Sequence, residues 1–206
     1  MSKLSRVPLF PLSGAILFPR SHLPLHIFED RYRAMVQDAM AGQGRIAMIQ
    51  PSDDGDALYQ VGCVGELVGV EELDDGRFNI MLLGSQRFRL IAEADGGTPY
   101  RQADIDLEAF DDSDPDALSS IQRADVEREA RRFGDSLSLA VDWDAVGRLD
   151  DEMLVNAIAQ VAPFDAGAKQ ALLEATTLPE RADLVVQLMQ FQRLAPGGAD
   201  MTQTVQ

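Results

Sequence analysis

The chain is poor in the residues that crosslink proteins, bind metals or shuttle protons. Its 206 residues include one cysteine, two histidines and one tryptophan. A single cysteine, Cys63, cannot form an internal disulfide, so we expect a reducing compartment and a cytoplasmic protein. The surrounding residues Val61-Gly62 and Val64-Gly65 are typical of a buried strand. This setting favours a packing role for the thiol over a reactive one.

Long apolar runs and an excess of positive charge are also missing. No stretch approaches the roughly 18 apolar residues that span a bilayer. Prolines 8, 11 and 19 interrupt the apolar run that follows Lys3 and Arg6, and no small-residue cleavage site follows it. The formal net charge of −16 disfavours nucleic acid and anionic membrane surfaces, because both attract clustered Lys and Arg. We therefore expect no nucleic-acid partner, no membrane partner and no signal peptide.

Residue patterns that carry catalysis or bind metals are likewise missing. His22 and His26 have the spacing of a helical zinc pair, but the intervening Leu-Pro-Leu favours an extended chain. Neither a Gly-x-Ser-x-Gly elbow nor a phosphate-binding loop occurs. The only lysines, Lys3 and Lys169, lie at a terminus and in the opening turn of an expected helix, where we expect too little desolvation for a catalytic base. The sequence predicts no catalytic residue, no cofactor and no metal.

The segment before residue 111 has the pattern of a β domain. Short apolar runs punctuated by Gly and Pro predict strands over 23–27, 46–49, 59–73, 78–92 with a break at Gly84-Ser85, and 100–110. Helical spacing over 30–40 predicts one early helix. Glycines 62, 65 and 69 indicate bulges or bends, and Asp75-Gly76 indicates a hairpin turn. Residues 1–110 are therefore expected to form a bent or barrel-like sheet of about six strands.

The segment after residue 116 has helical periodicity instead. An acidic junction over 111–116 separates the two regimes; Ser113 or Asp114 is expected to cap the next helix, and the loop lacks the Gly and Glu of a calcium-binding EF-hand. Apolar stripes predict helices that contain Ile121 and Val161, and Asp150, Asp165 and Thr177 are expected caps. The expected domains are a helical bundle over 117–195 and a disordered tail over 196–206. The fold class is α+β.

Several motifs in the β half resemble one known family. They are VPLFPL at 7–12, AILFP at 15–19, LPLHIFEDRY at 23–32, GSQRFR at 84–89 and YRQA at 100–103. The fourth is similar to a Gly-x-x-Arg-Phe-x signature. Together they resemble the N-terminal domain of Lon-type ATP-dependent proteases. The resemblance covers nearly the whole chain, more loosely in the helical half.

The resemblance implies a PUA-like β pseudo-barrel followed by a helical bundle. It also implies a substrate-recognition module for unfolded or degron-bearing polypeptides. In Lon proteases an ATPase and a Ser-Lys peptidase follow this region, and the chain ends where they would begin, so we expect a non-catalytic protein. Its expected peptide-binding residues are Phe18, Pro19, Tyr32 and Arg87, in a groove between the barrel and the helical bundle. An exposed sheet edge is also expected to be able to add a peptide strand.

Most of the motif residues also have a purely structural explanation. Phe28 is expected to act as a hydrophobic staple at the start of the early helix. Arg87 is expected to pair with an acid across the sheet. Other readings stay open: an adaptor for a separate protease or for one fixed protein partner, an RNA-binding PUA-like protein, and a small-molecule enzyme with an unrecognised site. The apolar last helix also allows a homodimer.

Overall fold

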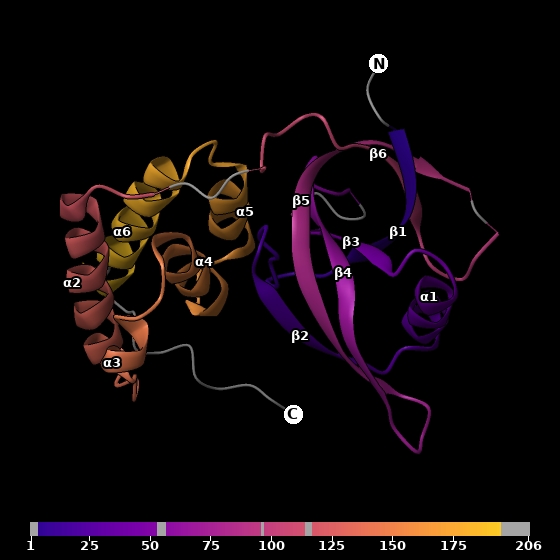
Figure 1. Cartoon of the computed structure of the whole chain (residues 1–206), viewed down its shortest axis with the longest axis horizontal. Helices are drawn as coiled ribbons and strands as arrows, with labels where there is room; N and C mark the ends of the chain where they lie inside the picture. The colour runs from indigo at the N-terminus through magenta and orange to yellow at the C-terminus, as the bar shows by residue number, and fades with distance from the viewer. Residues whose placement is uncertain (1–3, 53–56, 96, 114–116, 195–206) are drawn as a thin grey trace. The chain divides into compact units, whose positions relative to one another are not determined.

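The computed structural model describes residues 4–52, 57–95, 97–113 and 117–194. The chain separates into two compact units, which differ in their secondary structure (Figure 1). The β unit comprises residues 1–114 and 165–174, and the helical unit comprises residues 115–164 and 175–206. Within the described part, no helix combines the length and the apolar character that crossing a membrane requires. The predicted tail over 196–206 lies outside the described residues.

The β unit is built on one six-stranded sheet. Its strands are β1 (Leu4–Pro11), β2 (His22–Ile27), β3 (Arg45–Ile49), β4 (Val61–Glu72), β5 (Phe78–Ala94) and β6 (Gln102–Asp106). They lie in the order β2-β5-β4-β3-β1-β6, and β5 pairs with β6 as well. This extra pairing closes β5, β4, β3, β1 and β6 into a ring and leaves β2 at the edge. The predicted α+β class and the six-stranded sheet are confirmed.

Strand β5 is longer than the sequence predicts. Its 17 residues form one strand through Gly84 and Ser85, so the predicted break is a bulge instead: Val64 pairs with Gln86 and Gly65 with Gly84, and the register passes over Ser85. Gly84 is needed because a Cβ at that position would lie 1.9 Å from the Phe18 carbonyl oxygen. Strand β6 ends at Asp106 and is shorter than predicted. The β4–β5 register shifts at Gly65 and Gly69, as expected of bulges. At Gly62 the prediction is wrong: the register is regular, and the glycine admits the Phe88 ring.

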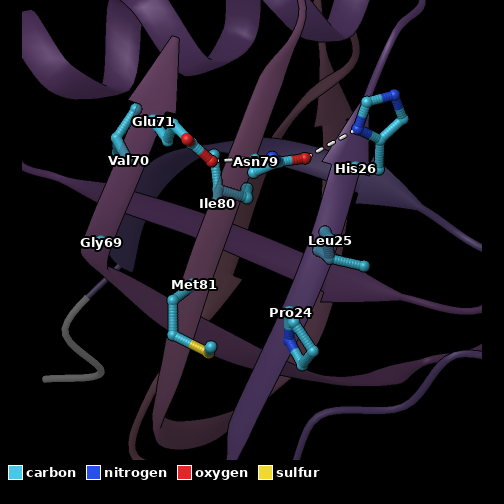
Figure 2. Close-up of a pocket in the computed structure, with 9 residues that line it drawn as sticks. All are labelled: Pro24, Leu25, His26, Gly69, Val70, Glu71, Asn79, Ile80 and Met81. Carbon is cyan, nitrogen blue, oxygen red and sulfur yellow. Dashed lines mark hydrogen bonds between the residues drawn. The ribbon is translucent and has the colours of Figure 1, made fainter. Parts of the chain in front are cut away.

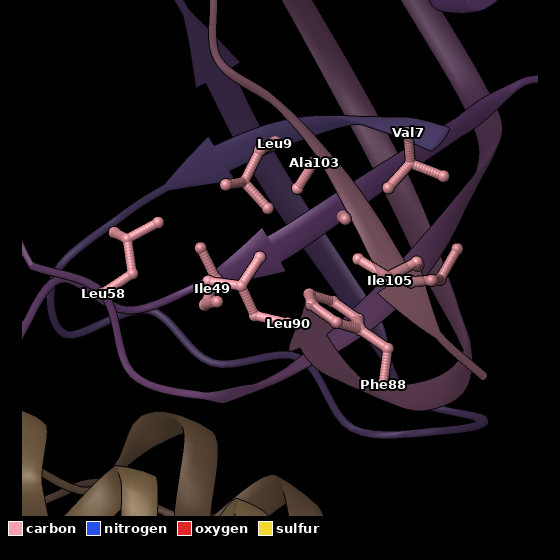
Figure 3. Packing of buried hydrophobic residues seen from close by; sticks show 10 residues of the cluster. Val7, Leu9, Ile49, Leu58, Phe88, Leu90, Ala103 and Ile105 are labelled. Carbon is pink, nitrogen blue, oxygen red and sulfur yellow. The ribbon is translucent and has the colours of Figure 1, made fainter. Parts of the chain in front are cut away.

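The inside of the ring is filled by apolar side chains from all five of its strands. Alternation along each strand sends every second side chain inward. Figure 3 shows the resulting cluster, which also takes in one residue of the segment between β3 and β4. Its buried members are Val7, Leu9, Ala47, Ile49, Leu58, Val64, Phe88, Leu90, Ala103 and Ile105.

A buried ion pair joins β5 to the segment that follows β6. The Arg87 guanidinium donates to Asp112 Oδ1 over 2.8 Å, and the Arg87 backbone amide donates to Asp112 Oδ2 over 2.8 Å. Another guanidinium nitrogen donates to the Leu173 carbonyl at the end of helix α5 (Ala166–Glu174). The guanidinium also lies 4.6 Å from the Phe110 ring centroid. The acid that pairs with Arg87 therefore lies beyond β6 and not across the sheet.

Helix α5 belongs to the β unit, although the chain on either side of it belongs to the helical unit. Polar side chains fix it there: Gln170 donates to the Val61 carbonyl, Gln50 to the Ala166 carbonyl, and Lys169 to the Gly14 carbonyl. Burial lowers the pKa of Lys169. The expectation that Lys169 is too exposed to be desolvated is therefore wrong, and its ammonium group has a structural hydrogen bond.

Helix α1 (Asp30–Ala41) confirms the predicted early helix. The expected staple is wrong, because Phe28 is 62% exposed. Instead, the Tyr100 hydroxyl links α1 to the rest of the β unit by donating to Asp38 Oδ2 over 2.7 Å. Burial, together with this hydrogen bond to a carboxylate, raises the pKa of Tyr100 to about 12.

The helical unit contains α2 (Ser120–Ser136), α3 (Trp143–Val146), α4 (Asp151–Val161) and α6 (Leu178–Leu194). The caps at Asp150, Asp165 and Thr177 are confirmed. Helix α2 is capped by Ser119, which forms a capping box with Gln122. The predicted cap at Ser113 is wrong, because the Ser113 hydroxyl donates to Asp111 instead. Asp114, the alternative cap, lies outside the described residues. Ile121 and Val161, predicted in apolar stripes, are 75% and 82% exposed.

Removing the carboxylate of Asp112 should destabilise the protein strongly. The Asp112→Ala variant leaves the Arg87 guanidinium buried without its counter-charge, which costs about 3–5 kcal/mol. Urea unfolding measures the loss. Asp104→Ala is the control, because Asp104 pairs with Arg6 at the surface and exposed pairs contribute little. Equal losses in the two variants would contradict a dominant buried pair.

The raised pKa of Tyr100 predicts a pH dependence of stability. The folded state favours the protonated phenol, so its contribution is complete below the ordinary pKa of 10.0 and is lost as the pH rises through about 12. Phenolate absorbance should show that Tyr100 is still protonated at about pH 11. Asp38→Asn should lower the Tyr100 pKa. Ionisation of all three tyrosines near pH 10 would count against the contact.

Candidate functional site

The outer face of β2, β5 and β4 carries side chains in matched rows. The strand registers align Pro24, Met81 and Gly69 in one row, and His26, Asn79 and Glu71 in another. The row between them contains Ile80, which is buried. Because side chains alternate across a sheet, the two flanking rows face away from the ring interior.

A shallow hollow lies in this face beside Gly69. The glycine lets Met81 pack close to the β4 backbone, because a Cβ at position 69 would lie only 3.3 Å from the Met81 Cβ. The hollow has a volume of about 560 Å³ and is lined by the nine residues that Figure 2 labels. Pro24, Leu25, Val70 and Met81 give it apolar walls. Methionine suits such a surface, because its unbranched side chain adapts to different contacts.

One rim of the hollow is a directed chain of hydrogen bonds. Arg77 Nη1 lies 3.3 Å from His26 Nε2, and His26 Nδ1 lies 2.8 Å from Asn79 Oδ1. A guanidinium only donates, so Nε2 must accept and Nδ1 must carry the proton. The Asn79 amide then donates to Glu71 Oε2 over 2.8 Å. Asp75 holds Arg77 in place, and this hydrogen bond lowers the pKa of Asp75.

A second hollow lies on the other side of β2, where β1 ends and α1 begins. It has a volume of about 190 Å³, and its lining includes Phe10, Phe28 and Tyr32. The Phe10 and Tyr32 rings are in contact, with centroids 4.4 Å apart. The Arg31 guanidinium covers the Tyr32 ring and pairs with Glu29. The two hollows share Leu25 and His26; we call them together the β2 surface.

This arrangement can bind a ligand by apolar contact and hydrogen bonds. Its only histidine, His26, has both ring nitrogens engaged by Arg77 and Asn79. Among the residues that the structure describes, no group of three or more His, Cys, Asp or Glu is placed to hold a metal ion.

The four residues predicted from the sequence do not form one exposed cluster. Phe18 and Arg87 are 0% and 3% exposed, and Pro19 is also buried. Tyr32, at 9%, lines the second hollow. A ligand could contact Phe18, Pro19 and Arg87 directly only if these side chains left their buried positions. The four-residue site stays a prediction. The sequence reasoning missed Met81, although the Asp75-Gly76 hairpin could have placed it opposite Gly69.

The hydrogen-bond chain predicts the tautomer of His26. With a neutral ring, nitrogen NMR should show a protonated Nδ1 and an unprotonated Nε2, the reverse of the form that free imidazole side chains prefer. Arg77→Ala removes the donor to Nε2 and should shift the population toward the Nε2-protonated form, whereas Arg45→Ala should not. A wild-type ring protonated on Nε2 would contradict the chain of bonds.

Comparison with known proteins identifies relatives across most of the chain. The family model of the ATP-dependent protease La (LON) substrate-binding domain matches residues 6–190. Lon protease 2 of Sorangium cellulosum is 29% identical, with 89% of this chain aligned to 24% of that protein. Lon protease 1 of Bdellovibrio bacteriovorus is 26% identical, with 85% aligned to 23%. The chain thus spans about a quarter of the length of these relatives.

Solved structures share the fold. The N-terminal domain of the Mycobacterium avium complex Lon protease superposes with a TM-score of 0.67 at 17% identity, covering 90% of this chain and 98% of that one. The Lon N-terminal domain protein from Xanthomonas campestris gives a TM-score of 0.65 at 19% identity, covering 91% and 98%. With the family match over residues 6–190, the chain belongs to the LON substrate-binding domain family.

Proposed function

We propose that the protein recognises polypeptide segments at the β2 surface and does not cleave them. The observation that carries this proposal is the pair of hollows that meet at Leu25 and His26, apolar within and hydrogen-bonding at the rim. An extended polypeptide offers side chains to such hollows and backbone groups to their rims. Membership of a substrate-binding domain family supports a polypeptide as the ligand.

A polypeptide that lies across the face of β2, β5 and β4 accounts for the β2 surface better than one that adds a strand to the free edge of β2. Among the described strands, β2 stands at the end of the sheet order beside β5, which is the position that strand addition requires. However, Pro24 in the middle of β2 has no amide hydrogen, so the edge lacks a donor there. The side chains of Pro24 and Met81 instead supply apolar contact area on the face.

Electrostatics favour basic or neutral segments. The net charge of −16 attracts cationic chains over a distance and repels acidic ones. At the β2 surface, Arg31 and Arg77 are already paired with Glu29 and Asp75. Glu71 keeps a carboxylate at the rim of the larger hollow, where it can meet a basic side chain.

We also propose a fold name and a biological role for the protein. We take the closed ring within residues 1–110 as a PUA-like pseudo-barrel, and α2, α3, α4 and α6 within residues 117–195 as a bundle, with α5 packed in the β unit. We take the protein as a cytoplasmic recognition module that binds unfolded or degron-bearing polypeptides and acts as an adaptor for a separate protease. The family match supports recognition. Capture of the protein with a protease from cell extract tests the adaptor role.

Disrupting the larger hollow should weaken peptide binding. The probe is a fluorescein-labelled 15-residue peptide that contains leucine, phenylalanine and arginine, and anisotropy measures its dissociation constant. Met81→Asp places a charge in the apolar hollow and should raise the constant at least about tenfold, since a charge buried without a partner is costly. Ile91→Asp is the control, because Ile91 is an exposed residue of the same strand outside both hollows.

Equal affinity of wild type and Met81→Asp would show that the peptide binds elsewhere. Absence of saturable binding by the wild type, at low salt and with several such peptides, would remove the proposed function itself.

A further inference from the structure

The helical unit contains an apolar pocket that shares no lining residue with the β2 surface. Its volume is about 150 Å³. Helix α2 contributes Phe133, α3 contributes Trp143, α4 contributes Ala157, and α6 contributes Met189. Every residue that lines the pocket is apolar. The pocket is therefore built from all four helices of the unit, and the indole N–H of Trp143 is the one hydrogen-bonding group among its lining side chains.

The pocket opens to solvent through an apolar mouth. Val161 at the end of α4 and Leu139 after α2 both line it, and they are 82% and 54% exposed. Charged residues adjoin Trp143, one of the walls: the Arg131 guanidinium lies 4.8 Å from the Trp143 ring centroid, and the exposed Asp142 and Asp144 flank that tryptophan in the sequence. An apolar interior thus adjoins a polar surface.

Size and chemistry together specify the occupant. A pocket of about 150 Å³ with apolar walls has room for a benzene-sized group. It is too small for a helix. A free metabolite with several polar groups would find at most the Trp143 indole N–H as a partner inside, which is costly. An apolar amino-acid side chain avoids this cost, because its polar backbone can stay outside the mouth.

We propose that this pocket receives one aromatic or branched aliphatic side chain of a bound polypeptide. The proposal rests on the proposed function, since it takes a polypeptide as the ligand, and it adds a second anchoring site in the helical unit. The pocket selects for a phenyl or isobutyl group at one position of that polypeptide.

Trp143 makes the pocket directly observable, because it is the only tryptophan of the chain and lines the pocket. Two fluorescein-free peptides that differ only by Phe→Ser at one position are titrated into the full chain. The phenylalanine peptide should shift Trp143 emission to shorter wavelength and bind about tenfold more tightly than the serine peptide. The capped amino acid N-acetyl-phenylalaninamide, at millimolar concentration, should cause the same emission shift.

Two variants and a matched control test the site. Ala157→Phe fills the pocket and Leu139→Asp places a charge at its mouth; both should abolish the emission shift and remove the preference for the phenylalanine peptide. Ile121→Asp is the control, because Ile121 is an exposed apolar residue of α2 that does not line the pocket. It should behave as the wild type. Circular dichroism and thermal melting confirm that each variant is folded.

The outcomes separate this proposal from the proposed function. Peptide binding that is weakened by Met81→Asp, yet leaves Trp143 emission and the Phe→Ser preference unchanged, would overturn the pocket alone. Binding that needs the pocket but ignores Met81→Asp would overturn the β2 surface alone. A response to N-acetyl-phenylalaninamide without any to peptides would make the pocket a small-molecule site and overturn the proposal. Emission that changes with protein concentration would assign the pocket to a second copy and overturn it too.

Discussion

The backbone hydrogen bonds of strand β5 are the interaction on which the β unit depends. The strand pairs with β2 and β4 along its first part, and with β4 and β6 along its second. Strand β5 therefore closes the ring and also pairs with the edge strand β2, which contributes to the outward-facing rows of side chains. The same backbone aligns Asn79 and Met81 with their neighbours in β2 and β4, so the geometry of the candidate site follows from pairing in the sheet. Register, set by the turn at Gly76, determines which side chains meet.

Short sequence motifs predict local structure reliably where the residue type has a single structural role. Asp75-Gly76 predicted a hairpin, and Gly76 adopts the positive φ of 76° that such a turn requires. Thr177 and Glu180 form the predicted reciprocal cap. Signals with several physical uses were ambiguous. Gly84 looked like a break in a strand, but it allows the Phe18 backbone to pass close to an unbroken one.

The candidate site was harder to predict than the fold. Motif residues such as Phe18 and Arg87 drew attention because they resemble a family pattern, and they are buried in the core or in an ion pair. Family patterns emphasise residues that hold a fold together. The hollows depend on which side chains face outward at matching positions of three strands, and periodicity alone does not give that register. Helix α3 and its Trp143 were missed for a related reason, since four residues are too few to show a helical period.

The placement of α5 has a consequence for how the chain folds as it is synthesised. Gln50, which follows β3, and Val61 of β4 hydrogen-bond to a helix that lies more than a hundred positions later in sequence. Arg87 also reaches the Leu173 carbonyl at the end of that helix. On the ribosome, therefore, the ring can pair its strands early, but these polar groups must wait for most of the helical unit to emerge. The amino-terminal half is completed last, by a segment that leaves the exit tunnel after α2 and α4.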